Sequence, residues 1–236
     1  MRLLLLLLLM PLAGVSATDH SPAWQLPPYE TFLKIIPPPP VPGSPAEQAD
    51  LDGVLALQDH PTKQELEHAE RSVAFTVFSF SEVLGPEFRA ESHPETAQFF
   101  KRLEATANEP KNFLKDNYRR PRPYKSFPSK VKELVDEENG YSYPSGHSNR
   151  AWLFALVLGD LDPQHRNAVL CSAMQVCNDR VIGGMHYPSD MMASRVLAEE
   201  LHRILSKNPD FARDLEQLRA SEWKNGFQKN PSTSVQ

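Results

Sequence analysis

The sequence predicts an all-α fold, a single-domain helical bundle. Signals for helix starts recur along the chain, and no stretch of useful length alternates apolar and polar residues as a half-buried strand does. The 236 residues are 40% hydrophobic and 23% charged, which suffices for one buried core and is short for two. We therefore expect about eight helices around one core.

The charge balance excludes several classes of partner. The chain has 25 Lys and Arg residues against 30 Asp and Glu residues, which gives a formal net charge of -5. Because no global basic field exists, we expect no nucleic acid binding and no attraction to anionic lipid. The spread of apolar residues and the small net charge also exclude general disorder.

Residues 1–17 are typical of a secretory signal peptide that is cleaved. Arg2 precedes the apolar run 3–15, and small side chains precede the expected cleavage point after Ala17. The run is shorter than the about 20 residues that a membrane-spanning helix needs, and no later segment approaches that length. We expect a periplasmic or secreted protein with no membrane span; an uncleaved anchor is the alternative.

Residues 18–45 form a proline-rich arm that precedes the folded domain, residues 46–236. Nine of the 22 prolines lie in this arm, including the run 37–40, and proline disrupts both helices and sheet ladders. Apolar side chains just before that run favour a strap packed along the domain over a flexible linker: Phe32, Leu33, Ile35 and Ile36.

Capping-box spacings open the first two expected helices. Ser44 precedes Glu47 by three residues, and Thr62 precedes Glu65 in the same way. The second helix continues to Gly85 with an apolar density typical of burial on most sides, so we expect it to be the central helix. Later helices are expected to start near Pro94, Pro110, Ser145, Pro163, Pro188 and Pro209.

The two cysteines, Cys171 and Cys177, are not expected to form a disulfide with each other. Six helical residues rise about 9 Å, beyond the roughly 7 Å limit between bridged Cα atoms. Two buried free thiols are the simplest expectation, and an intermolecular bridge would need one of them to face outward.

Two clusters have the chemistry to bind an anion. Lys115 stands seven residues before Arg122, and the prolines on either side of Arg122 end the helix and hold the cations in place. Ser145 and Gly146 lead into an apolar helix whose first turn offers unpaired N–H groups, and His147 stands beside them. Taken singly, the first cluster fits a solvated basic turn and the second an ordinary serine N-cap.

The third cluster contains Arg180, His186 and Asp190. On a helix that begins near His186, the histidine and Asp190 share a face, so the carboxylate can hold one ring nitrogen and leave the other free to act. A metal site is the competing interpretation, but the chain has no His-Glu-x-x-His, no Cys-His cluster and no carboxylate array to complete one. We therefore expect no metal and no cofactor.

Together the clusters suit phosphoryl transfer. The transferred group spreads negative charge over three oxygens, so positioning and electrostatic stabilisation supply most of the catalysis. Lys115, Arg122 and Arg180 suit those oxygens. The residues alone do not decide which histidine attacks, although an oriented neutral imidazole next to Asp190 is the better nucleophile.

The three motifs, in this order, resemble the signature of the type-2 phosphatidic acid phosphatase and vanadium haloperoxidase-like superfamily. They are Lys-x6-Arg-Pro, Pro-Ser-Gly-His and Arg-x5-His-x3-Asp, between Lys115 and Asp190. Together with the expected signal peptide and the proline-rich arm, these motifs make the chain resemble a class A bacterial non-specific acid phosphatase. The resemblance implies an all-α bundle of that type and metal-independent hydrolysis of small phosphomonoesters with broad specificity.

The resemblance also implies roles at the matching positions. His186 would attack phosphorus and form a phosphohistidine, with Asp190 orienting its ring. His147 would protonate the leaving alkoxide and later activate water. The phosphate-binding residues would be Lys115, Arg122, Ser145, Gly146 and Arg180.

Two further expectations accompany this mechanism. A neutral His186 and a protonated His147 predict a bell-shaped pH dependence, with Asp190 raising the pKa of His186. Asp179 stands where the family usually has serine, directly before Arg180. On a helix it can face away from the pocket and pair with another cation.

Other functions stay open at this point. A vanadate-dependent haloperoxidase would use the same anion pocket, although such chains are usually much longer. A non-catalytic exported protein that captures phosphate would need neither His186 nor Asp190. An integral lipid phosphatase is disfavoured by the missing membrane spans. Alcohols would compete with water as phosphate acceptors, and the arm and the apolar helices offer surfaces for a homodimer.

Overall fold

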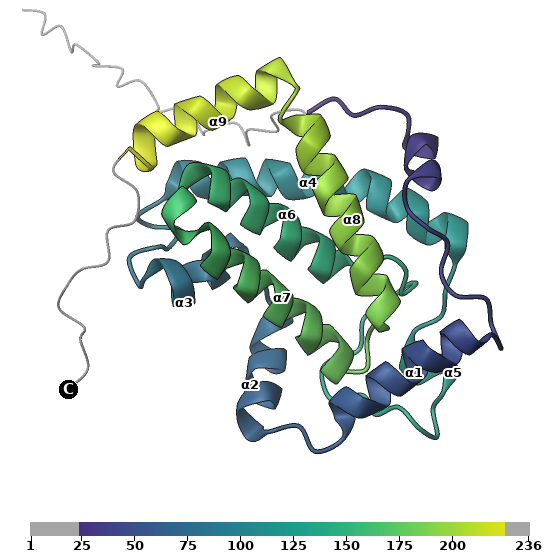
Figure 1. Cartoon of the computed structure of the whole chain (residues 1–236). Coiled ribbons are helices and arrows are strands. Elements are labelled where there is room, and N and C mark those ends of the chain that lie inside the picture. The colour runs from purple at the N-terminus through teal and green to yellow at the C-terminus, as the bar shows by residue number, and fades with distance from the viewer. Residues whose placement is uncertain (1–23, 225–236) are drawn as a thin grey trace, which may run out of the picture.

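The computed structural model describes residues 24–224, in which all regular secondary structure is helical, as predicted (Figure 1). The α-helices in this range are α1 (Pro45–Gln58), α2 (Lys63–Ser72), α3 (Ser81–Leu84), α4 (Pro94–Tyr118), α5 (Pro123–Ser126), α6 (Gly146–Leu161), α7 (Arg166–Ile182), α8 (Pro188–Leu205) and α9 (Pro209–Glu222). Three 3-10 segments accompany them: η1 (Tyr29–Lys34), η2 (Val77–Phe80) and η3 (Pro163–His165). The expected signal peptide lies outside the described residues. Between residues 24 and 224, no helix combines the length and apolar character needed to cross a bilayer.

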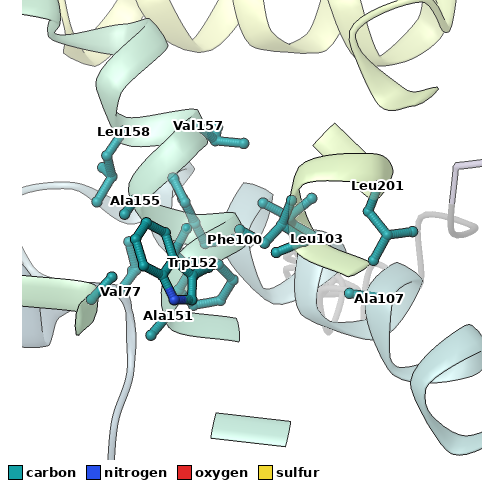
Figure 2. Close-up of a cluster of buried hydrophobic side chains, with 14 of the residues drawn as sticks. Val77, Phe100, Leu103, Ala107, Ala151, Trp152, Ala155, Val157, Leu158 and Leu201 are labelled. Carbon is teal, nitrogen blue, oxygen red and sulfur yellow. The ribbon is translucent and has the colours of Figure 1, made fainter. Parts of the chain in front are cut away.

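Helix α6 is the central helix of the bundle. It contacts α4, α7 and α8, and twelve of its sixteen residues are buried. A helix that is apolar on nearly all sides is stable only in the interior, which explains its position. Figure 2 shows part of the core around it, with Phe100 of α4, Trp152 of α6 and Leu201 of α8.

The expected central helix over 62–85 is wrong in both length and position. Helix α2 begins at the predicted capping box but ends at Ser72. The backbone then turns, and the Thr76 hydroxyl caps η2. The apolar density of this stretch belongs to turn and 3-10 residues such as Phe75 and Phe80, which are buried without continuing the helix.

The helix start expected at Pro110 is also wrong, because α4 runs past this residue. Pro110 is buried in a stripe of α4 that includes Leu103 and Leu114. The burial of that stripe offsets the hydrogen bond that proline cannot donate. The uninterrupted helix places Lys115 in its last turn, at the site described below.

Within residues 24–45, the arm packs along the domain as a strap does. Its buried side chains belong to the main hydrophobic core: Trp24, Phe32 and Ile36. Ile35, in contrast, is 38% exposed. The Tyr143 hydroxyl, close to the site, donates to the carbonyl of Pro37. The buried side chains of the arm therefore pack against the core of the same chain.

Cys171 and Cys177 are both free, as expected. Both lie on α7, where Cys177 is buried and Cys171 is exposed. The expectation of two buried thiols is therefore wrong for Cys171. Six helical residues rotate the side chain by about 240° around the axis, which places the two cysteines on different sides.

Candidate active site

The structure gathers the predicted site residues around the N-terminus of α6. They come from the last turn of α4 (Lys115), the segment before α5 (Arg122), the start of α6 (Ser145, Gly146 and His147), the last turn of α7 (Arg180) and the start of α8 (His186 and Asp190). A cavity of about 560 Å³ opens over them, and Lys115, Arg122, Gly146 and His147 line it. Arg180, His186 and Asp190 are fully buried beneath.

His186 and Asp190 form the predicted pair. Nδ1 of His186 lies 3.3 Å from Oδ2 of Asp190. Helix α8 begins at Pro188, so His186 precedes it, and the carboxylate also accepts the N–H of Tyr187 at 2.9 Å. Burial lowers the pKa of His186 below its ordinary value and outweighs the hydrogen bonds with Asp190 and Glu138, which raise it. Asp190 thus raises this pKa as expected, but the burial of the ring, which the sequence does not predict, sets the net direction.

A buried ion-pair network holds Asp190, and the sequence analysis did not find it. Arg120 Nη1 lies 2.7 Å from Oδ1 of Asp190, and Nη2 lies 2.7 Å from Oδ2 of Asp50 on α1. The guanidinium also stacks 3.7 Å from the ring centroid of Tyr187. Burial raises the pKa of Asp190, but the contacts with His186 and Arg120 outweigh it and hold that pKa below its ordinary value. Asp190 therefore stays ionised.

The anion pocket holds a carboxylate of the chain itself, that of Glu138. Its oxygens lie 2.9 Å from Arg122 Nη2 and 2.5 Å from Arg180 Nη2. They also lie 3.0 Å from Nδ1 of His147 and 3.5 Å from Nε2 of His186. Burial raises the pKa of Glu138, but hydrogen bonds with both histidines outweigh it, so the pKa lies far below its ordinary value. Two guanidinium and two imidazole groups thus bind one carboxylate.

Sequence reasoning missed Glu138 because no spacing singles it out. It is one of several acidic residues in the stretch 133–138, between the first two motifs. The one feature of the sequence that points to Glu138 is the position of this acidic stretch between the first two anion-binding motifs. Spacing identifies neighbours on one helix, whereas Glu138 contacts residues from four separate segments.

The two ring nitrogens of His147 have different surroundings. Nε2 lies 3.1 Å from the carbonyl oxygen of Val73, and Nδ1 faces Glu138. Because a carbonyl can only accept a hydrogen bond, Nε2 carries a proton and Nδ1 is the nitrogen that can exchange one. The ring is therefore oriented with its exchangeable nitrogen toward the anion pocket.

Ser145 and Gly146 form the cap that the sequence predicts. The Ser145 hydroxyl accepts the N–H of Ser148 at 3.3 Å, and Ser145 is fully buried. The N–H groups of Gly146 and His147, in the first turn of α6, have no intrahelical acceptor. These N–H groups, at the positive end of the helix dipole, can bind an anion.

Lys115 has a low pKa for a lysine. Burial, followed by repulsion from Arg122, lowers the pKa of Lys115 to about 7. Its ammonium donates to the carbonyl of Tyr141. Its charge therefore depends on pH in the neutral range, unlike those of the two arginines.

Asp179 faces away from the pocket, as expected. Its Oδ2 lies 2.7 Å from Nδ1 of His68 on α2, and its side chain is fully buried. The carboxylate therefore joins α7 to α2 and does not line the anion pocket. Among residues 24–224, no group of three or more His, Cys, Asp or Glu side chains is placed to hold a metal ion.

Comparison with known proteins identifies the family to which this fold belongs. Residues 103–211 match the PAP2 superfamily. The chain is 29% identical to a non-specific acid phosphatase of Providencia stuartii over 79% of this chain and 79% of that protein. It is 32% identical to a non-specific acid phosphatase of Salmonella typhimurium over 78% of this chain and 77% of that protein.

A solved structure shares the fold. The crystal structure of a transmembrane PAP2 type phosphatidylglycerolphosphate phosphatase from Bacillus subtilis matches with a TM-score of 0.50 and 20% identity, over 74% of this chain and 89% of that one. The match of residues 103–211 and the similarity to the acid phosphatases place the chain in the PAP2 superfamily. Within it, the chain belongs to the family of the non-specific acid phosphatases, which are phosphoric monoester hydrolases.

Proposed function

We propose that this chain is an exported acid phosphatase that hydrolyses a broad range of phosphomonoesters through a phosphohistidine, without a metal. The observation that carries the proposal is the carboxylate of Glu138, which two arginines and two histidines hold in the anion pocket. A substrate phosphate would replace this carboxylate. Its phosphorus would then lie beside His186 and its ester oxygen beside His147.

In the first step, Nε2 of His186 attacks phosphorus. Arg122 Nη1 lies 3.1 Å from Nε2 and can only donate, and once phosphate has replaced the Glu138 carboxylate, Nε2 presents a lone pair while Asp190 holds Nδ1–H. The N–P bond forms as the ester P–O bond breaks, and the bond's electron pair leaves with the alkoxide oxygen. Nδ1 of His147 gives its proton to that oxygen.

The cations stabilise the charge of the transferred group. Arg122 and Arg180 surround the pocket, Lys115 lines the cavity, and the first-turn N–H groups of α6 point toward the same region. Electrostatic stabilisation in a site that excludes most water is the largest contribution expected for phosphoryl transfer.

In the second step, water replaces the leaving group. Nδ1 of His147 takes a proton from this water as its oxygen attacks phosphorus. The N–P bond breaks, its electron pair returns to Nε2 of His186, and phosphate departs. An alcohol in place of water would receive the phosphoryl group in the same way.

Hydrolysis of p-nitrophenyl phosphate by the mature protein tests the proposal. Between about pH 4 and 9, we expect turnover that resists chelator and that is lost in His186→Ala. Loss of turnover with chelator, or retained turnover in His186→Ala, would contradict the mechanism. Halide-dependent peroxidase activity with added vanadate would identify a haloperoxidase instead, and no turnover at all would favour a binding protein.

Export depends on residues 1–17, which precede the described part of the chain. We propose cleavage after Ala17, so that the mature chain begins at Thr18 with the arm and continues into the catalytic domain, residues 46–236. N-terminal sequencing of the protein recovered from the periplasmic or culture fraction checks this. An intact Met1 in that fraction would contradict it.

A further inference from the structure

The cavity extends beyond the anion pocket to two further basic residues. Lys111 lies on α4 one turn before Lys115, and Arg150 lies on α6 one turn after Gly146. Both line the same cavity as His147. In the proposed mechanism His147 protonates the leaving group, so the leaving group must occupy this cavity and lie near Lys111.

Lys111 lies directly beside the phosphate-binding end of α6. A Cβ atom built on Gly146 would lie 3.4 Å from Cδ and 3.7 Å from Nζ of Lys111. The ammonium donates to Oδ1 of Asn108 at 2.8 Å. In the part of the chain that the structure describes, no ion pair joins Lys111 to a carboxylate.

Among the described residues, the cavity wall next to Lys111 contains a buried hydrogen-bond donor that has no partner. Glu104 accepts from Arg150 at 2.5 Å, but Arg150 Nε is buried with no hydrogen-bond partner among the described residues. Burial and the nearby Arg150 lower the pKa of Lys111 from its ordinary value and outweigh the nearby carboxylates, chiefly that of Glu104, which raise it. A bound anion would therefore relieve repulsion between partly buried cations.

We propose that Lys111 determines specificity by binding a second phosphoryl group carried by the leaving group. The chain would then prefer bisphosphorylated substrates over monoesters with a neutral leaving group. The inference rests on the proposed function, which places the reacting phosphate next to Lys115. Four helical residues separate Lys111 from Lys115, a rise of about 6 Å along the axis, which one small molecule with two phosphoryl groups can span.

A matched pair of substrates tests this preference. Propyl phosphate and propane-1,3-diyl bisphosphate differ only in the remote phosphoryl group, and phosphate release gives kcat/KM for each. In Lys111→Met, which keeps most of the side-chain stem, we expect kcat/KM to fall about tenfold for the bisphosphate and less than about twofold for propyl phosphate. Lys111→Arg should restore most of the preference, because it restores the charge. Lys101→Met, on an exposed part of α4, is the matched control and should change neither value.

Calorimetric titration with the bisphosphate measures its affinity for the proposed subsite, independently of turnover. Weaker binding in Lys111→Met supports the subsite even if neither substrate releases phosphate, a result that would contradict only the proposed function. Equal losses of kcat/KM for both substrates, or equal binding of the bisphosphate by the parent and Lys111→Met, would overturn the subsite.

Discussion

At the scale of single residues, burial sets the protonation states that the chemistry needs. His186 is fully buried, and its lowered pKa keeps the imidazole neutral to a lower pH than that of a free histidine. Lys115 is half-buried at the cavity wall, and its pKa of about 7 means that it loses its charge as the solution becomes alkaline. Protonation of His186 therefore limits activity in acid, and in base the loss of the Lys115 charge adds to the need for a protonated His147.

The pH profile of kcat/KM follows from these two shifts. The acid limb should lie below pH 6.5, because kcat/KM falls only when His186 becomes protonated. The alkaline limb should lie near pH 7, because Lys115 must be charged to bind phosphate. In Lys115→Arg the guanidinium stays charged, so the alkaline limb should move upward whatever the absolute rate. An alkaline limb that does not move in this variant would rule out Lys115 as its source.

Glu138 should compete with phosphate for the pocket. Replacing it in Glu138→Gln removes the charge that pairs with Arg122 and Arg180, so inorganic phosphate should inhibit with a Ki about tenfold lower. The neighbouring Glu137→Gln, at an exposed position, is the control and should leave the Ki unchanged. An unchanged or higher Ki in Glu138→Gln would show that the carboxylate supports phosphate binding.

The site residues differ in how far the sequence predicts them. Motif spacing finds His186 and Asp190 because a helical start places them within reach, and it finds Ser145 because a cap has a local signature. Motif spacing does not identify Glu138 or Arg120, because their partners lie far away in the sequence. Motif spacing also does not predict the pKa of His186, since the extent of its burial depends on the packed structure.

At the scale of elements, Arg120 connects α1 to the start of α8. It pairs with Asp50 and Asp190, and all three side chains are buried. This connection holds the carboxylate that in turn orients His186. Arg120 is therefore expected to influence both stability and the pH profile.

Arg120→Met should leave Asp50 and Asp190 buried without their cation. The free energy of unfolding, measured by denaturant titration, should fall by about 3–5 kcal/mol. Asp190 would then act more strongly on His186 and raise the pKa of the imidazole, so the acid limb of kcat/KM should move to higher pH. Arg119→Met, at an exposed position, should change neither quantity. Unaltered stability and an unmoved acid limb would contradict this role.

Local signals predict helix starts better than helix ends. The caps at Ser44, Thr62 and Ser145 begin helices as expected, because capping depends on adjacent residues. The end of α2 at Ser72 and the passage of α4 through Pro110 do not follow from local signals. Both depend on which face meets the core, and that is a tertiary property.

At the scale of the whole molecule, the arm links the start of the described chain to the site. Phe32 and Ile36 are buried in the main core, and the neighbouring carbonyl of Pro37 accepts from Tyr143, two residues before the cap of α6. The all-α architecture follows from composition and periodicity, whereas a second, smaller cluster of buried side chains, which includes Leu51 and Val181, does not. The apolar side chains of the arm predict that it packs as a strap, but which of them are buried follows only from the packed structure.

Removing the Phe32 ring should destabilise the fold without changing the chemistry. Phe32→Ala leaves a cavity in the core and should reduce the free energy of unfolding by about 3–5 kcal/mol, measured in denaturant. Ile35→Ala, at a position that is 38% exposed, should cost much less. A loss at Phe32 no larger than that at Ile35 would show that the arm does not contribute to the core.

The central claim is that a phosphoryl group passes through His186. Rapid mixing of the mature protein with substrate, an alkaline quench that preserves phosphohistidine, and peptide mass spectrometry test it most directly. We expect one phosphoryl group on the peptide that contains His186, forming and decaying as fast as turnover, and none in His186→Ala. Phosphate release without this adduct, or an adduct on His147, would contradict the account.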